Sequence, residues 1–569
     1  VTISTGTGSN TDGGFNATGN DSVINVNTLT NALATANVTV TTGGFGSAGS
    51  QAGDITVAAP IVWSSGSTLT LSAYRNIAVN AAITNTGGAN VNLRADNSGL
   101  GSGTVSFGTS IQVSTAGAVN IYYNPTSNPA TGTPSVNATS YMTATDYSGY
   151  VTGGGALSAY MLVNNVYDLQ NVNNNLSGTY ALGRDIDASV TAGWNSGAGF
   201  KPIGTLSMNA SYAYSGTPFY GVFDGQNYAI SNLTINRPST NVTGLFTGNS
   251  GQIRNFGVTS GSITGNIYVG GLVGQNYGNI INSFSGASVS GYRYSGGLVA
   301  DHEGGVIRSS YATGDVSNTL RGQGSGGDSA GGLVGYNRAA VVGSYATGNV
   351  YAQGGMAGGL VGQNIGSISQ SYATGSVTAI YAGGLVGTQV GSITQSYATG
   401  PVNGSYAPQS GGLIAYEGAP GSNVTNSYWD TQTTGQSSGM GGSTNGTFQA
   451  TGLTTAQFAN SANMPGLTFG TTPGASGFVI VDPDGTFNNA SGVNGATRPF
   501  LLSEYSTSIA NAHQLQLISL APSASYTLMR NIDLSAALGS SSGNWFTSNV
   551  LGDGYGFVPI GGSGHIPFL

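Results

Sequence analysis

The sequence predicts an all-β fold, an elongated right-handed parallel β-helix, and three observations support this prediction. Short segments alternate apolar and small polar residues with a period of two, as half-buried strands do. A Gly-Gly-Leu-Val block returns at nearly equal intervals in the middle of the chain. Charged residues make up only 6% of the 569 residues, whereas Gly is found 96 times. Repeats of about 26 residues predict stacked units, each in contact only with its neighbours.

The composition excludes several classes of protein. Disordered chains are poor in aromatic residues and rich in net charge, whereas this chain has 30 Tyr, 18 Phe and a net charge of −8. Its 12 Lys and Arg residues are dispersed, so we expect no nucleic acid partner. The absence of Cys excludes disulfides and thiolate metal sites. The sequence contains no run of about 18 apolar residues, so we expect no membrane-spanning helix.

Residues 1–150 form a first region of short alternating segments. Clusters of Gly, Asn or Ser separate these segments, and no stretch of helical period lies between them. We therefore expect a β-helical shaft made of short strands. The clearest segments are residues 54–61, 67–73, 76–83, 90–94 and 117–122.

Residues 246–435 form a repeat array. Its leucines are almost evenly spaced, apart from one longer interval between Leu298 and Leu333. A second block, typically Ser-Tyr-Ala-Thr-Gly, follows each Gly-Gly-Leu-Val at about half the repeat length. The leucines are Leu245, Leu272, Leu298, Leu333, Leu360, Leu385 and Leu413.

One repeat is long enough for one coil of three strands and their turns. We expect the Gly-Gly pair to turn with positive φ and to pass close to the next coil, so that Leu and Val enter the core. A single coil buries too little apolar surface to fold alone. Coils stacked about 4.8 Å apart would make a rod on the order of 100 Å long from about 22 coils.

Stacking also predicts columns of equivalent side chains. We expect one column to join polar groups by hydrogen bonds along the stack. It contains Asn276, His302, Asn337, Asn364, Gln389 and Glu417. For the tyrosine column, a half-buried structural ladder is favoured over an exposed platform for sugar rings. It contains Tyr311, Tyr345, Tyr372, Tyr397 and Tyr428.

A longer duplication relates two distant parts of the chain. Leu169-Gln170 and residues 180–187 match Leu515-Gln516 and residues 526–533 at one constant offset, and residues 200–204 match residues 557–561. In the first copy the chain continues into the array, so we expect the parent protein to run past Leu569 into another array.

The repeated blocks resemble the GLUG motif of large bacterial surface proteins. Residues 427–435 with 452–456 look like the segment that closes GLUG arrays in filamentous-haemagglutinin-like exoproteins, and residues 55–73 are similar to the shaft of that class. The resemblance implies export by a two-partner outer-membrane transporter and a place outside or on the surface of a Gram-negative bacterium. It also implies adhesion to a glycan or another receptor, with no catalytic residues or cofactors. Self-association is a separate expectation, because an open terminal coil presents unpaired backbone groups.

We therefore divide the chain into five predicted segments. Residues 1–150 are the shaft, 151–245 an irregular β-helix, and 246–435 the GLUG array. Residues 436–495 are a linker or loop-rich insertion, and 496–569 begin a truncated second copy of the 160–435 block.

Three histidines and five carboxylates are the candidate catalytic or metal-ligating residues. His302, His513 and His565 lie far apart, and residues 301–303 are expected in a turn, so no zinc site is predicted. Paired carboxylates could serve a polysaccharide-acting enzyme. We expect these carboxylates to lie in turns and to accept hydrogen bonds from exposed backbone. Ca²⁺ binding by Asp185 and Asp187 is the alternative. The carboxylates are Asp185, Asp187, Asp224, Asp430 and Asp533.

Residues 482–485 are expected to form a β-turn rather than a calcium loop. The sequence thus predicts a non-catalytic adhesin or fibre shaft whose repeated weak contacts act together. A filament-forming matrix protein and a polysaccharide-acting β-helical enzyme remain as alternatives.

Overall fold

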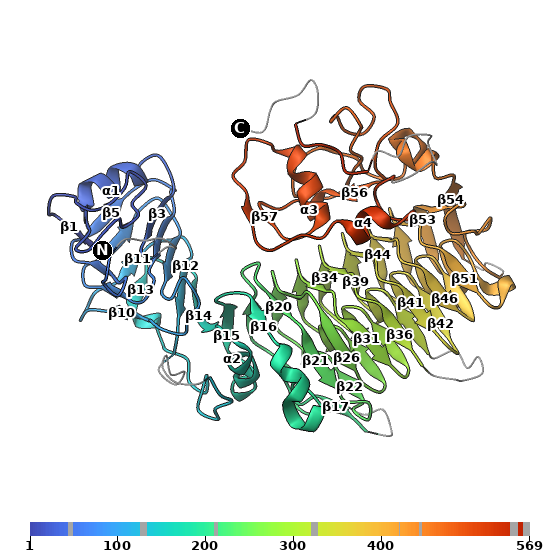
Figure 1. Ribbon diagram of the computed structural model, residues 1–569, viewed down its shortest axis with the longest axis horizontal. Helices are drawn as coiled ribbons and strands as arrows, with labels where there is room; N and C mark the ends of the chain where they lie inside the picture. The colour runs from blue at the N-terminus through green and yellow to red at the C-terminus, as the bar shows by residue number, and fades with distance from the viewer. Residues whose placement is uncertain are drawn as a thin grey trace. The chain divides into compact units, whose positions relative to one another are not determined.

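The computed structural model describes residues 1–43, 49–125, 134–209, 214–319, 328–419, 421–442, 446–546 and 556–561. These residues form two compact units. Unit 1 comprises Val1–Ile186 with Tyr220–Tyr228, and unit 2 comprises Asp187–Phe219 with Ala229–Leu569. Figure 1 shows unit 1 in blue to teal and unit 2 from green through yellow and orange to red.

Unit 1 is built of short parallel strands whose alternating apolar residues point inward. One sheet contains β1 (Thr2–Ser4), β2 (Val23–Asn25), β4 (Ile55–Val57), β7 (Ile77–Val79) and β10 (Val105–Phe107). A second contains β5 (Ile61–Trp63), β8 (Ile83–Asn85), β11 (Val113–Ser114) and β13 (Val151–Thr152). A third row contains β3 (Val38–Thr41), β6 (Leu69–Ser72), β9 (Val91–Arg94), β12 (Val119–Tyr123), β14 (Leu157–Val163), β15 (Thr179–Leu182) and β19 (Val222–Asp224).

A short helix, α1 (Val26–Leu33), covers the first strands of unit 1. Asn25 caps it by accepting hydrogen bonds from two backbone amides, and Val26, Leu29 and Leu33 are buried against β2, β3 and β5. The prediction that no helical segment interrupts residues 1–150 is wrong here. An Asn cap followed by apolar residues three and four positions apart favours a helix.

Unit 2 contains the repeat array, in which each coil contributes one strand to each of several parallel sheets (Figure 1). The first sheet contains β21 (Leu233–Asn236), β26 (Gly261–Thr264), β31 (Ser288–Gly291), β36 (Val316–Asn318), β41 (Val350–Ala352), β46 (Val377–Ala379) and β51 (Val402–Gly404). The second contains β22 (Val242–Thr243), β27 (Tyr268–Gly270), β32 (Tyr294–Gly296), β37 (Ser329–Gly331), β42 (Met356–Gly358) and β47 (Tyr381–Gly383). The third contains β23 (Phe246–Asn249), β28 (Val273–Asn276), β33 (Val299–His302), β38 (Val334–Asn337), β43 (Val361–Asn364), β48 (Val386–Gln389) and β52 (Ile414–Glu417).

The remaining side of the array carries two short strands in most coils. The first of each pair belongs to the row β24 (Gln252–Arg254), β29 (Asn279–Ile281), β34 (Val306–Arg308), β39 (Ala340–Val342), β44 (Ser367–Ser369) and β49 (Ser392–Thr394). The second belongs to the row β20 (Ala229–Ser231), β25 (Gly257–Val258), β30 (Phe284–Ser285), β35 (Tyr311–Ala312), β40 (Tyr345–Ala346), β45 (Tyr372–Ala373) and β50 (Tyr397–Ala398). Both rows continue into β53 (Asn423–Asp430), which pairs with β54 (Thr447–Leu453).

The register confirms the predicted coil. Val273 pairs with Val299, Val299 with Val334, and the column continues in parallel to Ile414. All seven repeat leucines are fully buried. The chain is therefore an all-β parallel β-helix in which inward Leu and Val residues form the core.

The Gly-Gly pairs are needed for close approach and not for a left-handed turn. None of the glycines in the Gly-Gly-Leu-Val blocks has a positive φ, so that part of the prediction is wrong. A Cβ at Gly359 would lie 2.1 Å from the carbonyl oxygen of Gly384 in the next coil, and a Cβ at Gly332 would lie 2.0 Å from that of Gly359. Neighbouring coils thus touch backbone to backbone at this corner.

Left-handed backbone is found instead at the corner that precedes each Ser-Tyr block. The φ angles there lie between 47° and 56°. Asn tolerates this conformation better than most residues, which explains its frequency at this corner. The residues are Asn255, Asn282, Ser309, Gly343, Gln370, Gln395 and Asn426.

The other elements are short. The antiparallel pairs are β17 (Ser207–Met208) with β18 (Tyr214–Ser215), and β55 (Phe478–Val479) with β56 (Phe500–Leu501). The strand β16 (Ile186–Asp187) and the parallel pair β57 (Ser508–Ile509) and β58 (Thr527–Leu528) complete the strands found in the described residues. The remaining helices are α2 (Val166–Asn171), α3 (Ala512–Leu517) and α4 (Ser535–Gly539).

Candidate functional site

A buried polar ladder runs along one corner of the array, as the sequence predicts. The Asn249 amide donates to Oδ1 of Asn276 over 2.7 Å. The same arrangement joins Asn337 to Asn364 over 2.7 Å and Asn364 to Oε1 of Gln389 over 3.0 Å. These side chains are fully buried, so each unpaired amide would carry a desolvation cost. The ladder therefore stabilises the stack.

His302 is one rung of this ladder. Its Nδ1 accepts from Nδ2 of Asn276 over 3.0 Å, and its Nε2 donates to the carbonyl oxygen of Ala340 over 3.2 Å. Burial lowers the pKa of His302 to about 4. The prediction that residues 301–303 form a turn is wrong for Asp301 and His302, which are buried in β33. The ring lies in the strand because its two nitrogens replace the hydrogen bonds of an amide.

The tyrosine column is a continuous stack of rings. Tyr345, Tyr372 and Tyr397 lie 4.9–5.0 Å apart between ring centroids, with planes within 3° of parallel. Phe284 and Tyr311 extend the stack at 4.9 Å spacings. A structural ladder is thus confirmed, with deeper burial of Tyr372 and Tyr397 than predicted.

Residues 446–546 pack over the tyrosine stack. Apolar side chains such as Phe458, Phe478 and Phe546 cover the rings. The phenol hydroxyl of Tyr372 donates to Oε1 of Glu504 over 3.0 Å, and the amide of Asn511 donates to the hydroxyl of Tyr311 over 3.0 Å. Because the rings are covered, the stack offers no platform for sugar rings in this structure.

A buried ion pair fixes this covering segment to the end of the array. Nη2 of Arg498 lies 2.9 Å from Oδ2 of Asp430, and both side chains are fully buried. The hydroxyl of Thr455 also donates to Asp430, and the Arg498 guanidinium lies 4.9 Å from the ring centre of Phe546. Asp430, considered as a catalytic carboxylate, thus has a structural partner.

The other candidate carboxylates are dispersed. Asp187 is exposed, and hydrogen bonds from the side chain of Asn232 and then from the backbone amide of Ser189 lower its pKa. Asp533 similarly accepts from the amide of Ser535. Asp224 is buried, whereas Asp185 is exposed.

The remaining predicted positions have local roles. The amide of Gly485 donates to the carbonyl of Asp482 over 3.0 Å, which confirms the β-turn. Nδ1 of His513 lies 2.5 Å from Oε2 of Glu504 in the covering segment. His565 lies outside the described residues. Within the described ranges, no three His, Asp or Glu side chains gather as metal ligands, and no helix has the length and apolarity to cross a membrane.

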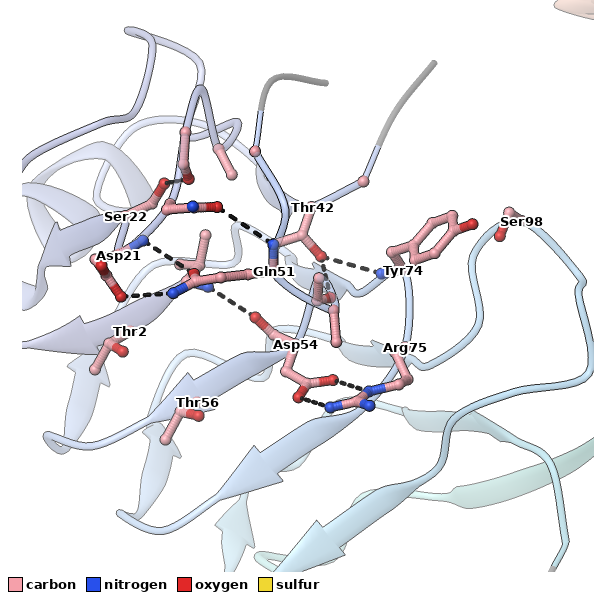
Figure 2. A pocket seen from close by; sticks show the side chains of 18 of the residues that line it. Thr2, Asp21, Ser22, Thr42, Gln51, Asp54, Thr56, Tyr74, Arg75 and Ser98 are labelled. Atoms are coloured by element: carbon pink, nitrogen blue, oxygen red, sulfur yellow. Dashed lines mark hydrogen bonds and ion pairs between the residues drawn. The ribbon is translucent and has the colours of Figure 1, made fainter. Parts of the chain in front are cut away.

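Unit 1 contains a polar pocket of about 840 Å³ that the sequence analysis missed. It lies where strands of successive coils begin and end. Figure 2 shows its main polar contacts. Arg75 donates two hydrogen bonds to Asp54, over 2.9 and 2.7 Å, and the amide of Gln51 donates to Asp21 over 2.6 Å. The Arg75 guanidinium is the main reason that the pKa of Asp54 is lowered.

Tyr74 provides the aromatic part of this pocket. Gly43 and Gly53 lie against its side chain, since a Cβ on either would come within 2.6 Å of the Tyr74 Cβ. Both glycines have positive φ, 73° and 75°. A side chain is therefore disfavoured at either position by the backbone conformation as well as by the contact with Tyr74. The hydroxyl of Thr42 accepts from the Tyr74 amide over 3.0 Å.

The pocket combines one ring with carboxylates, an amide, a guanidinium and hydroxyls. Its volume falls within the range of roughly 300–1,000 Å³ that is usual for small-molecule sites. Such planar polar groups can hold a ligand that carries several hydroxyls. The sequence signal was weak, because the residues come from five separate segments and only the adjacent pair Tyr74-Arg75 stands out.

Comparison with known proteins finds one family model and several similar chains. Residues 353–378 match the GLUG motif. A stretch of 142 residues is 35% identical to halomucin of Haloquadratum walsbyi (strain DSM 16790 / HBSQ001). It covers 24% of this chain and 2% of halomucin, so the chain spans only a small part of that relative.

Two solved structures are also similar. An IgA1 protease is 21% identical, with 46% of this chain and 21% of the protease covered and a TM-score of 0.33. A protein from Bacteroides ovatus assigned as an immunoglobulin A1 protease is 20% identical, with 42% and 75% covered and a TM-score of 0.32. Neither likeness bears on the activity of this chain.

Proposed function

We propose that this chain is a segment of a secreted, non-catalytic surface protein, an adhesin or fibre shaft that presents a carbohydrate-contacting pocket. The pocket of unit 1 is the observation that carries this proposal. Tyr74 supplies an aromatic ring on which a pyranose can stack, and Asp54, Arg75, Gln51 and Asp21 supply hydrogen-bonding groups in the same pocket. The match to the GLUG motif and the similarity to halomucin support a place at the cell surface.

The array suits the role of a stiff support. Its coils are joined by parallel strands, by the buried polar ladder and by the tyrosine stack, and these contacts resist bending. Weak contact sites held on such a support gain apparent affinity when several engage together. Following the resemblance to filamentous-haemagglutinin-like exoproteins, we infer export by a two-partner outer-membrane transporter of a Gram-negative bacterium.

A glycan array probed with the labelled full chain tests the pocket. We expect retention on at least one class of glycan, and a loss of about fivefold or more for Tyr74→Ala, taking as the scale the roughly 1–3 kcal/mol that a planar nucleic-acid base gains by stacking on an aromatic ring. Tyr292→Ala is the matched control, because Tyr292 is exposed in unit 2. The proposal is wrong if the unaltered chain binds no glycan, or if Tyr74→Ala binds as well as the unaltered chain.

The two alternatives make different predictions. A filament-forming matrix protein would show concentration-dependent light scattering by the purified chain. A polysaccharide-acting enzyme needs two carboxylates that face one groove. Asp430 is buried in its ion pair, and Asp187 and Asp533 accept backbone hydrogen bonds, so these positions favour structural roles. Release of reducing ends that is lost in Asp185→Asn would favour the enzyme instead.

A further inference from the structure

The two copies of the duplicated block have the same three-dimensional start. Asn165 caps α2 and Asn511 caps α3, with φ and ψ of −152° and 175° in the first and −151° and 172° in the second. A short 3₁₀ turn follows each helix, at Val172–Asn174 and Ile518–Leu520. The constant offset between the copies therefore holds in the backbone as well as in the sequence.

The strands that follow are also equivalent. Leu162 pairs with Ala181 in the first copy, and Ser508 pairs with Thr527 in the second. Two hydrogen bonds are repeated with the same lengths. The Tyr180 hydroxyl donates to the Asn175 carbonyl over 2.7 Å, as Tyr526 does to Ala521, and the Gly183 amide donates to Val163 over 2.9 Å, as Met529 does to Ile509. The described start of the second copy thus repeats the backbone pairing of the first.

The copies differ on one side of this coil. In the first copy β15 also pairs with β19, where Thr179, Tyr180 and Ala181 meet Val222, Phe223 and Asp224. In the second copy β58 pairs with β57 alone among the described residues. Leu182 is fully buried, whereas its counterpart Leu528 is 65% exposed, the largest value for a big apolar side chain in the described part of the molecule.

An apolar strand with an unpaired edge is a template for another strand. A singly exposed apolar residue is ordinary on a protein surface, so the unpaired strand edge beside Leu528 is what distinguishes this position. The first copy shows which strand fits this position, because β19 covers the same edge there. Its Phe223 lies against Tyr180, with ring centroids 6.0 Å apart and planes at 27°. Tyr526 stands at the equivalent position in the second copy.

We propose that the free edge of β58 is a docking site for a parallel strand of the β19 type, Gly-Val-Phe-Asp, carried by a further GLUG-type coil. Backbone hydrogen bonds along β58 supply the affinity, and the incoming Val and Phe cover Leu528 and Tyr526. This interaction surface is independent of the pocket in unit 1 and of any glycan that the pocket binds.

A single cysteine tests the site, because the chain contains none of its own. Leu528→Cys is introduced into residues 1–561 and into a fusion that continues after Gly561 with a copy of residues 205–302. That junction follows the alignment of residues 557–561 with 200–204. We expect maleimide labelling of the cysteine to slow by about tenfold or more in the fusion, since a covered site reacts only through opening. Val190→Cys, at a position that is 50% exposed, is the control and should label equally fast in both.

Hydrogen exchange on the unmodified chain provides a second measurement that needs no added coil. We expect the amide of Leu528 to exchange fast and the amide of Leu182 to exchange slowly. A protected Leu528 amide would overturn the proposal, because the edge would already be covered. Unchanged labelling in the fusion, or added coils that remain unprotected from exchange beside β58, would overturn it as well.

Discussion

Nδ1 of His302 accepts a hydrogen bond from Nδ2 of Asn276, 3.0 Å away, so a histidine replaces an amide in the buried polar ladder. The ring is still tied to the next coil, because its other nitrogen donates to the backbone carbonyl of Ala340 there. This arrangement needs the neutral ring. A proton on Nδ1 would bring two hydrogen-bond donors, Nδ1 of His302 and Nδ2 of Asn276, into contact in the buried interior.

The first prediction concerns this histidine and pH. Its pKa is lowered to about 4, from an ordinary value of 6.5, mainly by burial. The unfolded chain therefore binds the proton more readily, and stability falls as pH drops from 6.5 to 4, by about 3 kcal/mol from this group. We expect His302→Asn to remove this loss, because Asn occupies the equivalent position in neighbouring coils.

Urea unfolding of both chains at several pH values checks the prediction. The stability of His302→Asn relative to the unaltered chain should rise as pH falls from 6.5 to 4. A constant difference across that range would contradict a neutral histidine in the ladder. Asp301 must be considered in the same range, because burial raises its pKa to about 7 and gives a slope of opposite sign. Both chains keep Asp301, so this slope largely cancels in the comparison.

The second prediction concerns the buried ion pair. We expect Arg498→Ala to destabilise unit 2 by about 3–5 kcal/mol, because it leaves Asp430 buried without its counter-ion. The covering segment should loosen, and near-ultraviolet circular dichroism from the stacked tyrosines should weaken. Arg75→Ala is the matched control. The side chains of Arg75 and Asp54 are 45% and 37% exposed. The expected loss in the free energy of unfolding is therefore about 1 kcal/mol or less. Equal effects of the two substitutions would argue against a structural role for the buried pair.

The third prediction uses the left-handed corner. Ser309 and Gly343 occupy equivalent positions, with φ of 49° and 56°. We expect Ser309→Gly to raise the free energy of unfolding by about 1 kcal/mol and Gly343→Ser to lower it by a similar amount, since a side chain is strained in this conformation. Thermal unfolding of the two variants measures both effects. Two changes of the same sign would show that strain at this corner does not govern stability.

Local and periodic features of the sequence were sufficient to predict the coil. Nearly equal spacing places Leu245, Leu272 and Leu298 in one column, and the position four residues after each repeat leucine places His302 among the asparagines. The strand that holds His302 was not predicted, because Asp301-His302-Glu303 is polar enough to suggest a turn. His302 is buried because it belongs to a ladder of polar side chains from neighbouring coils. The sequence of one repeat does not reveal that ladder.

Features that depend on distant contacts could not be predicted. Tyr372 is covered by Glu504, which is 132 residues away in sequence. Nothing near the tyrosine indicates that cover. The Gly-Gly pairs illustrate a second limit. Glycine serves both left-handed turns and close approach, and only the position of the next coil shows that Gly359 serves the second. The pocket around Tyr74 was missed for the same reason, since its walls come from separate coils.

The stacked coil is tested most directly by the distance between two spin labels on one face of the array. Thr264, Ser317 and Asn403 lie in one outward column, Asn403 five coils from Thr264 and three from Ser317. At about 4.8 Å per coil, we predict Cα separations of about 24 Å for Thr264→Cys with Asn403→Cys and about 14 Å for Ser317→Cys with Asn403→Cys. Double electron–electron resonance, with continuous-wave line broadening for the shorter pair, should give two narrow distributions about 10 Å apart. Broad distributions, or two separations that do not differ by two coil heights, would contradict the stacked β-helix.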